Sequence, residues 1–116
     1  MPLNSVTDLQ RDIKKAAQGA ADVLRCLSND DRLLLMCQLS QGEASVAELE
    51  AATGIYQPTL SQQLSVMRRL NLVVTRREGK QIFYRIEDKR IIALLNTLYD
   101  LYCPNVAADR VKNSGN

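Results

Sequence analysis

Residues 57–86, QPTLSQQLSVMRRLNLVVTRREGKQIFYRI, decide the fold. Leu60, Leu64 and Met67 recur at the spacing of one helical face, which predicts a helix over residues 57–72. The opposite face carries hydrogen-bonding groups and one arginine: Thr59, Gln62, Ser65 and Arg69, with Gln57 and Ser61 at its edges. These side chains suit base edges and phosphates better than an ordinary solvated surface, which is usually rich in Lys and Glu.

A second, shorter helix is predicted just upstream. Ser45 begins a capping-box pattern, so we expect a helix over residues 46–53, followed by a turn at Gly54. Pro58 then stands at the expected first position of the next helix, where its missing N–H costs nothing. Two helices joined this closely, the second with a polar outer face, predict a helix-turn-helix over residues 46–72.

A β-hairpin is predicted after the second helix, over residues 73–86. Two runs rich in β-branched, aromatic and basic residues flank a tip at Glu78-Gly79, which is a hairpin signal. The fold class is therefore mainly α with a β-hairpin wing, a winged helix-turn-helix. The alternative is a plain helical core with a surface hairpin.

Charge favours the winged helix-turn-helix interpretation. Residues 57–85 hold six basic side chains and one acidic side chain, whereas the whole chain has a net charge of only +2. Because DNA is a dense line of negative charge, a local concentration of Lys and Arg matters more than the total. We interpret this region as a surface for double-stranded DNA.

The whole chain, residues 1–116, is short enough to be one domain, and its 46% hydrophobic content predicts a real core. We expect a cytoplasmic protein without a membrane partner, because no signal-peptide pattern or long apolar run is present. An enzyme is disfavoured, and no cofactor is expected, since the chain has no histidine, glycine-rich phosphate loop or C-x-x-C pair.

Three further helices complete the predicted fold. One spans residues 8–27, with a candidate interruption near Gly19, and a central apolar one spans residues 30–41. The last, within residues 88–103, is apolar on more than one face and needs two sets of neighbours. We expect homodimerisation through the N- and C-terminal helices; the alternative is a last helix fully buried in the monomer.

The order of these elements resembles the ArsR/SmtB family of bacterial repressors over nearly the whole chain. Three segments carry the resemblance: LSNDDRLLLMCQL, QPTLSQQLSVMRRLNLV and REGKQIFYRI. The resemblance implies a homodimeric, sequence-specific repressor that leaves its operator DNA when an inducer binds. An activator that displaces another bound protein, and a winged helix used only for protein contacts, are the alternatives.

The resemblance also implies the DNA-binding residues. Its reading-helix positions correspond to Gln57, Thr59, Ser61 and Gln62, and Arg69 lies on the same outward face. An amide of Gln62 or Gln57 suits a bidentate contact to adenine. The wing residues expected to hold phosphates or enter the minor groove are Arg77, Lys80 and Gln81.

Two inducer classes are compatible with the sequence. No metal site is expected, because histidine is absent and Ser45 and Ala47 stand where metal-sensing relatives carry Cys-x-Cys. A thiolate site for a metal or another ligand, built from Cys26, Cys37 and Cys103, remains the alternative.

The favoured inducer is a reactive sulfur species or another oxidant. Cys37 in LMCQL and Cys103 in LYCP resemble the dithiol of the BigR, SqrR and HlyU branch, which responds to persulfides and polysulfides. In that branch the two cysteines become linked within one subunit, by a disulfide or a longer sulfur bridge, and DNA is released. A reactive thiol with a resolving partner is the usual arrangement of such sensors. Cys26 is interpreted as a packing residue.

Overall fold

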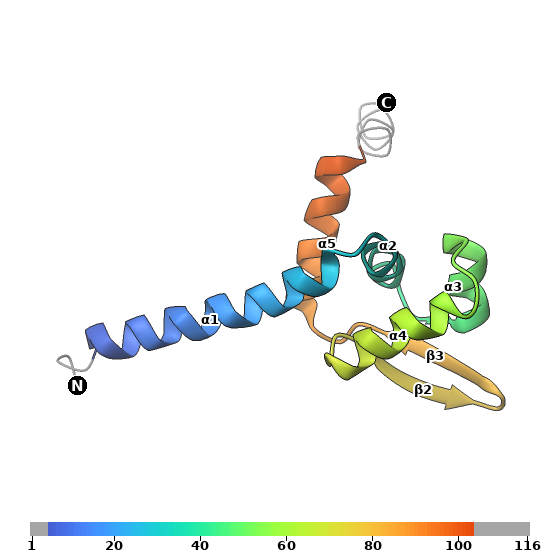
Figure 1. Ribbon diagram of the computed structural model, residues 1–116, viewed down its shortest axis with the longest axis horizontal. Coiled ribbons are helices and arrows are strands. Elements are labelled where there is room, and N and C mark those ends of the chain that lie inside the picture. The colour runs from blue at the N-terminus through green and yellow to red at the C-terminus, as the bar shows by residue number, and fades with distance from the viewer. Residues whose placement is uncertain (1–4, 104–116) are drawn as a thin grey trace, which may run out of the picture.

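The structure is a computed structural model that describes residues 5–103. It contains five helices and a small sheet within those residues (Figure 1). The helices are α1 (Ser5–Leu27), α2 (Asp30–Leu39), α3 (Val46–Thr53), α4 (Thr59–Arg69) and α5 (Lys89–Tyr102). The strands are β1 (Ala44–Ser45), β2 (Val74–Glu78) and β3 (Gln81–Arg85). Mainly helical content with one β-hairpin confirms the predicted fold class.

Helix α2 is the centre of the core, as its apolar composition predicts. It packs against α1, α3, α4 and α5, and its Leu35, Met36 and Leu39 are at most 2% exposed. The core therefore consists of aliphatic side chains gathered around one short helix. The helix ends at Leu39, earlier than the predicted residue 41, because Ser40 caps it and a turn follows.

The hairpin β2–β3 is extended to a three-stranded antiparallel sheet by β1, in the order β1-β3-β2. Ala44 pairs with Tyr84, and Arg76 pairs with Phe83. The prediction of a hairpin is confirmed, but its tip is Gly79-Lys80, where Gly79 has a φ of 63°. The sequence did not predict β1, because a strand of two residues is too short to show the alternation of apolar and polar residues that indicates a strand.

Helix caps explain where the helix-turn-helix begins and turns. Ser45 accepts a hydrogen bond from the N–H of Glu48, whose carboxylate accepts one from the N–H of Ser45. This reciprocal pair confirms the predicted capping box. At the other end of α3, Gly54 has a φ of 72°, the left-handed conformation that glycine adopts readily. The predicted bounds of α3 are confirmed.

Helix α4 is shorter than predicted at both ends. A residue before proline is disfavoured in helical conformation, so Gln57 lies in a turn and Pro58 is the N-cap rather than the first helical residue. At the other end, Asn71 takes a left-handed φ of 61°. The N–H groups of Asn71 and Leu72 donate to the carbonyls of Arg68 and Met67, which is a Schellman ending.

Helix α1 extends away from the rest of the protein (Figure 1). It begins by Ser5, before the predicted residue 8, because nothing in Ser5-Val6 disfavours a helix. It also passes Gly19 without a break, since one glycine costs only about 1 kcal/mol relative to alanine. Every side chain from Thr7 to Ala20 is exposed. Among residues 5–103, no helix is long and apolar enough to cross a membrane.

Candidate nucleic-acid interface and cysteine pair

The two faces of α4 separate as the sequence predicts. Leu60, Leu64 and Met67 are at most 2% exposed and hold the helix against the core. The residues predicted for the opposite, polar face lie on the other side: Ser61, Gln62, Ser65 and Arg69 are exposed, and Thr59 is half-buried. The apolar stripe therefore fixes which side chains α4 presents to solvent.

Gln57 has a local structural role that the sequence did not reveal. Its Oε1 accepts a hydrogen bond of 3.0 Å from the N–H of Ser61, in place of the cap that Pro58 cannot supply. Its Oε1 keeps a second lone pair and its Nε2 keeps two donors, but the bond to Ser61 fixes the direction in which the amide points. A bidentate contact to adenine needs both amide atoms facing the base, a requirement that the exposed Gln62 meets more readily than Gln57.

The hairpin presents some of its basic residues to solvent and neutralises others. Arg77, Lys80 and Gln81 are exposed around its tip. The guanidinium of Arg76 instead bonds the carboxylate of Glu43, with Nη2 to Oε1 at 2.7 Å, and lies 4.5 Å from the centroid of the Phe83 ring. Arg76 is therefore held against the protein.

The ion pairs modify the charge asymmetry seen in the sequence. Arg76 also pairs with Glu78 at 2.9 Å, and Arg85 pairs with Glu87 at 2.8 Å. The hydrogen bonds from Arg76 lower the pKa of the Glu43 carboxyl, so that group stays ionised. Glu43 and Glu87 lie outside residues 57–85, which is why the count over that range overstates the free positive charge.

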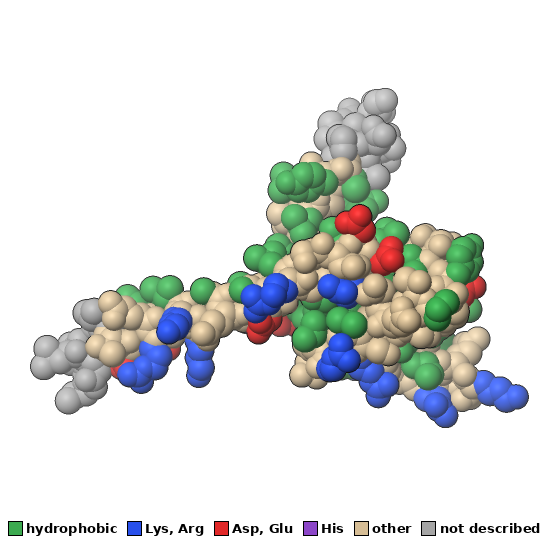
Figure 2. Space-filling view, in the orientation of Figure 1, with side chains coloured by type: hydrophobic (Ala, Val, Ile, Leu, Met, Phe, Trp, Pro, Cys, Tyr) green, Lys and Arg blue, Asp and Glu red, His purple; other side chains and the backbone are tan. Residues whose placement is uncertain are grey.

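The remaining basic side chains nevertheless gather on one side. Figure 2 shows Lys and Arg along the lower edge of the molecule, over α4 and the hairpin, and apolar side chains along the upper side of α1 and on α5. A surface that combines a polar reading helix with flanking cations suits a DNA duplex, because phosphate contacts position the protein and base contacts specify the sequence.

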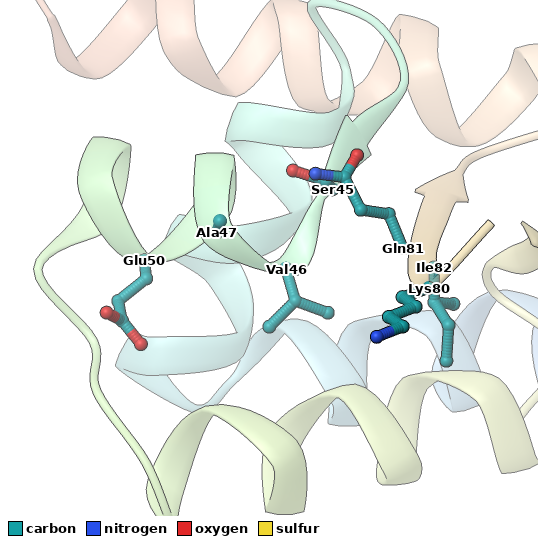
Figure 3. Close-up of a pocket in the computed structure, with 7 residues that line it drawn as sticks. All are labelled: Ser45, Val46, Ala47, Glu50, Lys80, Gln81 and Ile82. Atoms are coloured by element: carbon teal, nitrogen blue, oxygen red, sulfur yellow. The ribbon is translucent and has the colours of Figure 1, made fainter. Parts of the chain in front are cut away.

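A shallow hollow of about 370 Å³ lies between the start of α3 and β3. Figure 3 shows Val46 and Ala47 between Glu50 on one side and Lys80 on the other. Its lining contains neither cysteine nor histidine. No cluster of three or more potential metal ligands is found between Ser5 and Cys103.

The three cysteines occupy different environments, and all are free thiols. Cys26, in the last turn of α1, is 1% exposed. Burial raises the pKa of its thiol, although the nearby Arg32 guanidinium opposes that rise. Cys26 is thus a packed side chain, in keeping with its interpretation as a packing residue.

Cys37 and Cys103 are both half-buried. Cys37 lies in α2, and Cys103 is the C-cap of α5, with its N–H donating to the carbonyl of Tyr99. Burial raises the pKa of the Cys37 thiol, and the negative charge of a Cys103 thiolate raises it further. Two thiols distant in sequence are therefore close enough to interact electrostatically.

The fold and the basic reading surface define a winged helix-turn-helix protein of the DNA-binding class. A profile of bacterial regulatory proteins of the arsR family matches residues 29–75. The biofilm growth-associated repressor of Xylella fastidiosa strain Temecula1 is 48% identical over 101 residues, covering 86% of this chain and 89% of that protein. The chain belongs to the arsR family of bacterial regulatory proteins.

Other relatives show the same relationship. The transcriptional activator HlyU of Vibrio cholerae is 34% identical over 93 residues, covering 80% of this chain and 86% of that protein. The transcriptional repressor BigR from Xylella fastidiosa has a similar structure, with a TM-score of 0.75, 49% identity, and coverage of 81% of this chain and 96% of that one. A homodimeric winged helix-turn-helix DNA-binding domain from Mycobacterium bovis is also similar, with a TM-score of 0.63 and 31% identity. The match covers 86% of this chain and 90% of that one.

Proposed function

We propose that this transcriptional regulator is a homodimeric repressor that binds operator DNA and releases it when Cys37 and Cys103 are joined through sulfur. The sensing half of the proposal is supported by the packing of α2, which contains Cys37, against α5, which Cys103 caps, together with the effect of Cys103 on the pKa of the Cys37 thiol. The exposed polar face of α4 and the basic hairpin carry the DNA-binding half. The inducer is an oxidant of the persulfide or polysulfide class.

In the DNA complex, α4 enters the major groove. Gln62 reads a base edge through its free amide, while Thr59, Ser61 and the Nε2 of Gln57 make further polar contacts. The residues that hold the phosphate backbone or reach into the minor groove are Arg69, Arg77, Lys80 and Gln81. These contacts set affinity and its dependence on salt, whereas the α4 contacts set sequence preference.

The homodimer forms through α1 and α5. Leu9 and Ile13 in α1 are 59% and 60% exposed, and Leu101 and Tyr102 in α5 are 69% and 78% exposed. Both helices project from the rest of the protein (Figure 1), and apolar side chains this exposed are typical of a surface that a second copy covers. The homodimeric state of the related Mycobacterium bovis domain supports a homodimer, and the exposed apolar side chains are the reason for placing its interface on α1 and α5.

The sensing reaction balances without a metal or cofactor. One cysteine thiolate attacks the outer sulfur of a persulfide RSSH, forming Cys–S–SH and releasing RSH. The second thiolate attacks the cysteine-bound sulfur, forming the Cys37–Cys103 disulfide and releasing H₂S. The two cysteines are oxidised and the persulfide sulfur is reduced. A second RSSH that first lengthens the chain to Cys–S–S–SH gives a three-sulfur bridge instead.

The link changes DNA affinity because it joins helices with different partners. Cys37 belongs to the central α2, and Cys103 ends α5, which we assign to the dimer interface. A disulfide requires Cα atoms within about 7 Å, so the link fixes the end of α5 against α2. We propose that this constraint alters the spacing of the two reading helices, which must match successive major grooves about 34 Å apart.

The test is a gel shift with DNA from upstream of the protein's own gene, before and after treatment with polysulfide. Wild-type protein should lose operator affinity and two thiols together, with mass spectrometry showing whether extra sulfur is retained. The Cys37→Ser/Cys103→Ser variant should bind normally and resist release, whereas the matched control Cys26→Ala should respond like wild type. Normal release of the double variant refutes the dithiol mechanism.

A second candidate is activation by displacement of another DNA-bound protein. The name of the related HlyU as a transcriptional activator favours it. The same DNA-binding surface serves both outcomes, so the distinction lies in the promoter. A deletion strain separates them: loss of a repressor raises transcription from the bound promoter, and loss of such an activator lowers it.

A further inference from the structure

Arg32 joins three helices through one side chain. It lies in the first turn of α2, where its backbone N–H donates to the N-cap side chain of Asn29 at 3.0 Å. Its Nε donates to the carbonyl of Cys26, in the last turn of α1, at 2.9 Å. Its Nη1 donates to Oε1 of Gln63, in α4, at 2.9 Å. One guanidinium therefore connects α1, α2 and α4.

Each of these bonds has a physical reason. The carbonyl of Cys26 belongs to the last turn of α1, where carbonyls lack partners within the helix. The planar guanidinium has several donors in a rigid fork and can satisfy that carbonyl and Gln63 together. A lysine ammonium has its donors on one nitrogen atom, so it cannot bond the carbonyl of Cys26 and the amide of Gln63 in the way that the two separate nitrogens of Arg32 do.

Gln63 adjoins the residues assigned to DNA. Gln62 next to it is exposed, while Gln63 is half-buried on the inner edge of α4. The remaining contacts between α4 and the core are made mainly by the apolar stripe, which lacks the directionality of hydrogen bonds. The bond from Arg32 to Gln63 is directional, so it opposes rotation of α4 about its own axis.

We infer that Arg32 is a positioning residue that sets the orientation of α4 relative to α1 and α2. Through Gln63 it holds the polar face of the reading helix at the angle that the major groove requires. Cys37 lies on the same helix as Arg32, so a displacement of α2 reaches α4 through this bond. The inference rests on the proposed function, since it assumes that α4 reads DNA.

The test begins with Gln63→Met, which keeps the size of the side chain, removes the acceptor and leaves the bond from Arg32 to the carbonyl of Cys26 in place. Operator affinity should fall by about tenfold, because DNA binding must then supply the orientation of α4 that this hydrogen bond to a charged group had fixed beforehand. Gln63→Glu keeps an acceptor for Arg32 and should retain near-wild-type affinity. Thermal unfolding of each variant separates mispositioning from loss of structure.

A double-mutant cycle with Arg32→Lys completes the test. If the two residues act through one bond, Arg32→Lys should weaken binding little further in the Gln63→Met background. The ratio of operator affinities before and after polysulfide treatment should also shrink in Gln63→Met, which a general loss of stability does not predict. Wild-type affinity in folded Gln63→Met, or fully additive effects, would overturn the inference.

Failure of the proposed function gives a different result. If wild-type protein does not bind operator DNA with strong salt dependence, the DNA-binding assignment itself is wrong. If wild type binds but ignores polysulfide, only the sensing assignment fails. The comparison of Gln63→Met with wild type in untreated protein still decides the role of Arg32 in that case.

Discussion

Two neighbouring arginines of β2 should contribute very differently to DNA binding. Arg76 is bonded to Glu43 and Glu78 and lies over Phe83. Arg77 is exposed, and among residues 5–103 it takes part in no ion pair. A phosphate contact by Arg77 costs no existing ion pair, whereas Arg76 would have to give up two carboxylates.

The size of the effect follows from counterion release. A dimer carries two copies of Arg77, so Arg77→Gln should make the slope of log K against log salt shallower by about 1.8. Between roughly 50 and 200 mM salt, wild type should therefore lose about tenfold more affinity than the variant. The matched control is the double variant Arg76→Gln/Glu43→Gln, which removes an ion pair without changing net charge and should leave the slope nearly unchanged.

Fluorescence anisotropy with a labelled operator measures both slopes over the same salt range. Circular dichroism of each variant checks that the hairpin and helices are retained, because Glu43 and Arg76 also connect β2 to the loop before β1. Equal changes of slope for Arg77→Gln and the double variant would refute the distinction between free and paired arginines. An unchanged slope for Arg77→Gln would remove Arg77 from the DNA contacts.

Three further predictions concern the helix ends and the cysteines. Asn71→Val should lower the free energy of unfolding by about 1–2 kcal/mol in urea titrations, because the backbone at position 71 is left-handed. Asn71→Gly is the control, and equal stability of the Val and Gly variants would contradict this prediction. Hydrogen bonds from the Arg90 side chain and backbone N–H lower the pKa of Asp88 from 3.8 to about 2. Its stabilising effect is therefore complete above pH 3.8 and is lost as the pH falls through about 2, so Asp88→Asn should flatten the melting temperature over that window; an unchanged pH profile would contradict it. Because the pKa of the Cys37 thiol is raised, we expect Cys103 to attack the persulfide first. Mass spectrometry should therefore find that the Cys37→Ser variant is persulfidated at Cys103, whereas the Cys103→Ser variant reacts slowly. The reverse order of reactivity would refute this assignment.

Local patterns predict the parts of the fold that local physics controls. The burial of Leu60, Leu64 and Met67 follows from helical spacing alone. The capping box from Ser45 to Glu48 follows from residue types three positions apart. In both cases the partners lie within one or two helical turns, so the sequence already contains the geometry.

Contacts between distant segments were not predictable in the same way. Glu43 and Arg76 are 33 residues apart, and Arg32 and Gln63 are 31 apart. A local charge count therefore treats Arg76 as available for DNA, and a helical projection shows Gln63 as one more polar residue. No signal in a single sequence joins such pairs, because only the packing of the whole core brings them together.

The central place of α2 offers a route by which the proposed change at the cysteines would reach the DNA-binding surface. Leu35, Met36 and Leu39 are almost completely buried, and this helix packs against all four others. A close-packed interior cannot absorb a displaced helix by local compression. The sulfur link that we propose at Cys37, in the same ten-residue helix as Arg32, should therefore move neighbouring elements, and the directional bond to Gln63 makes α4 one that we expect to move.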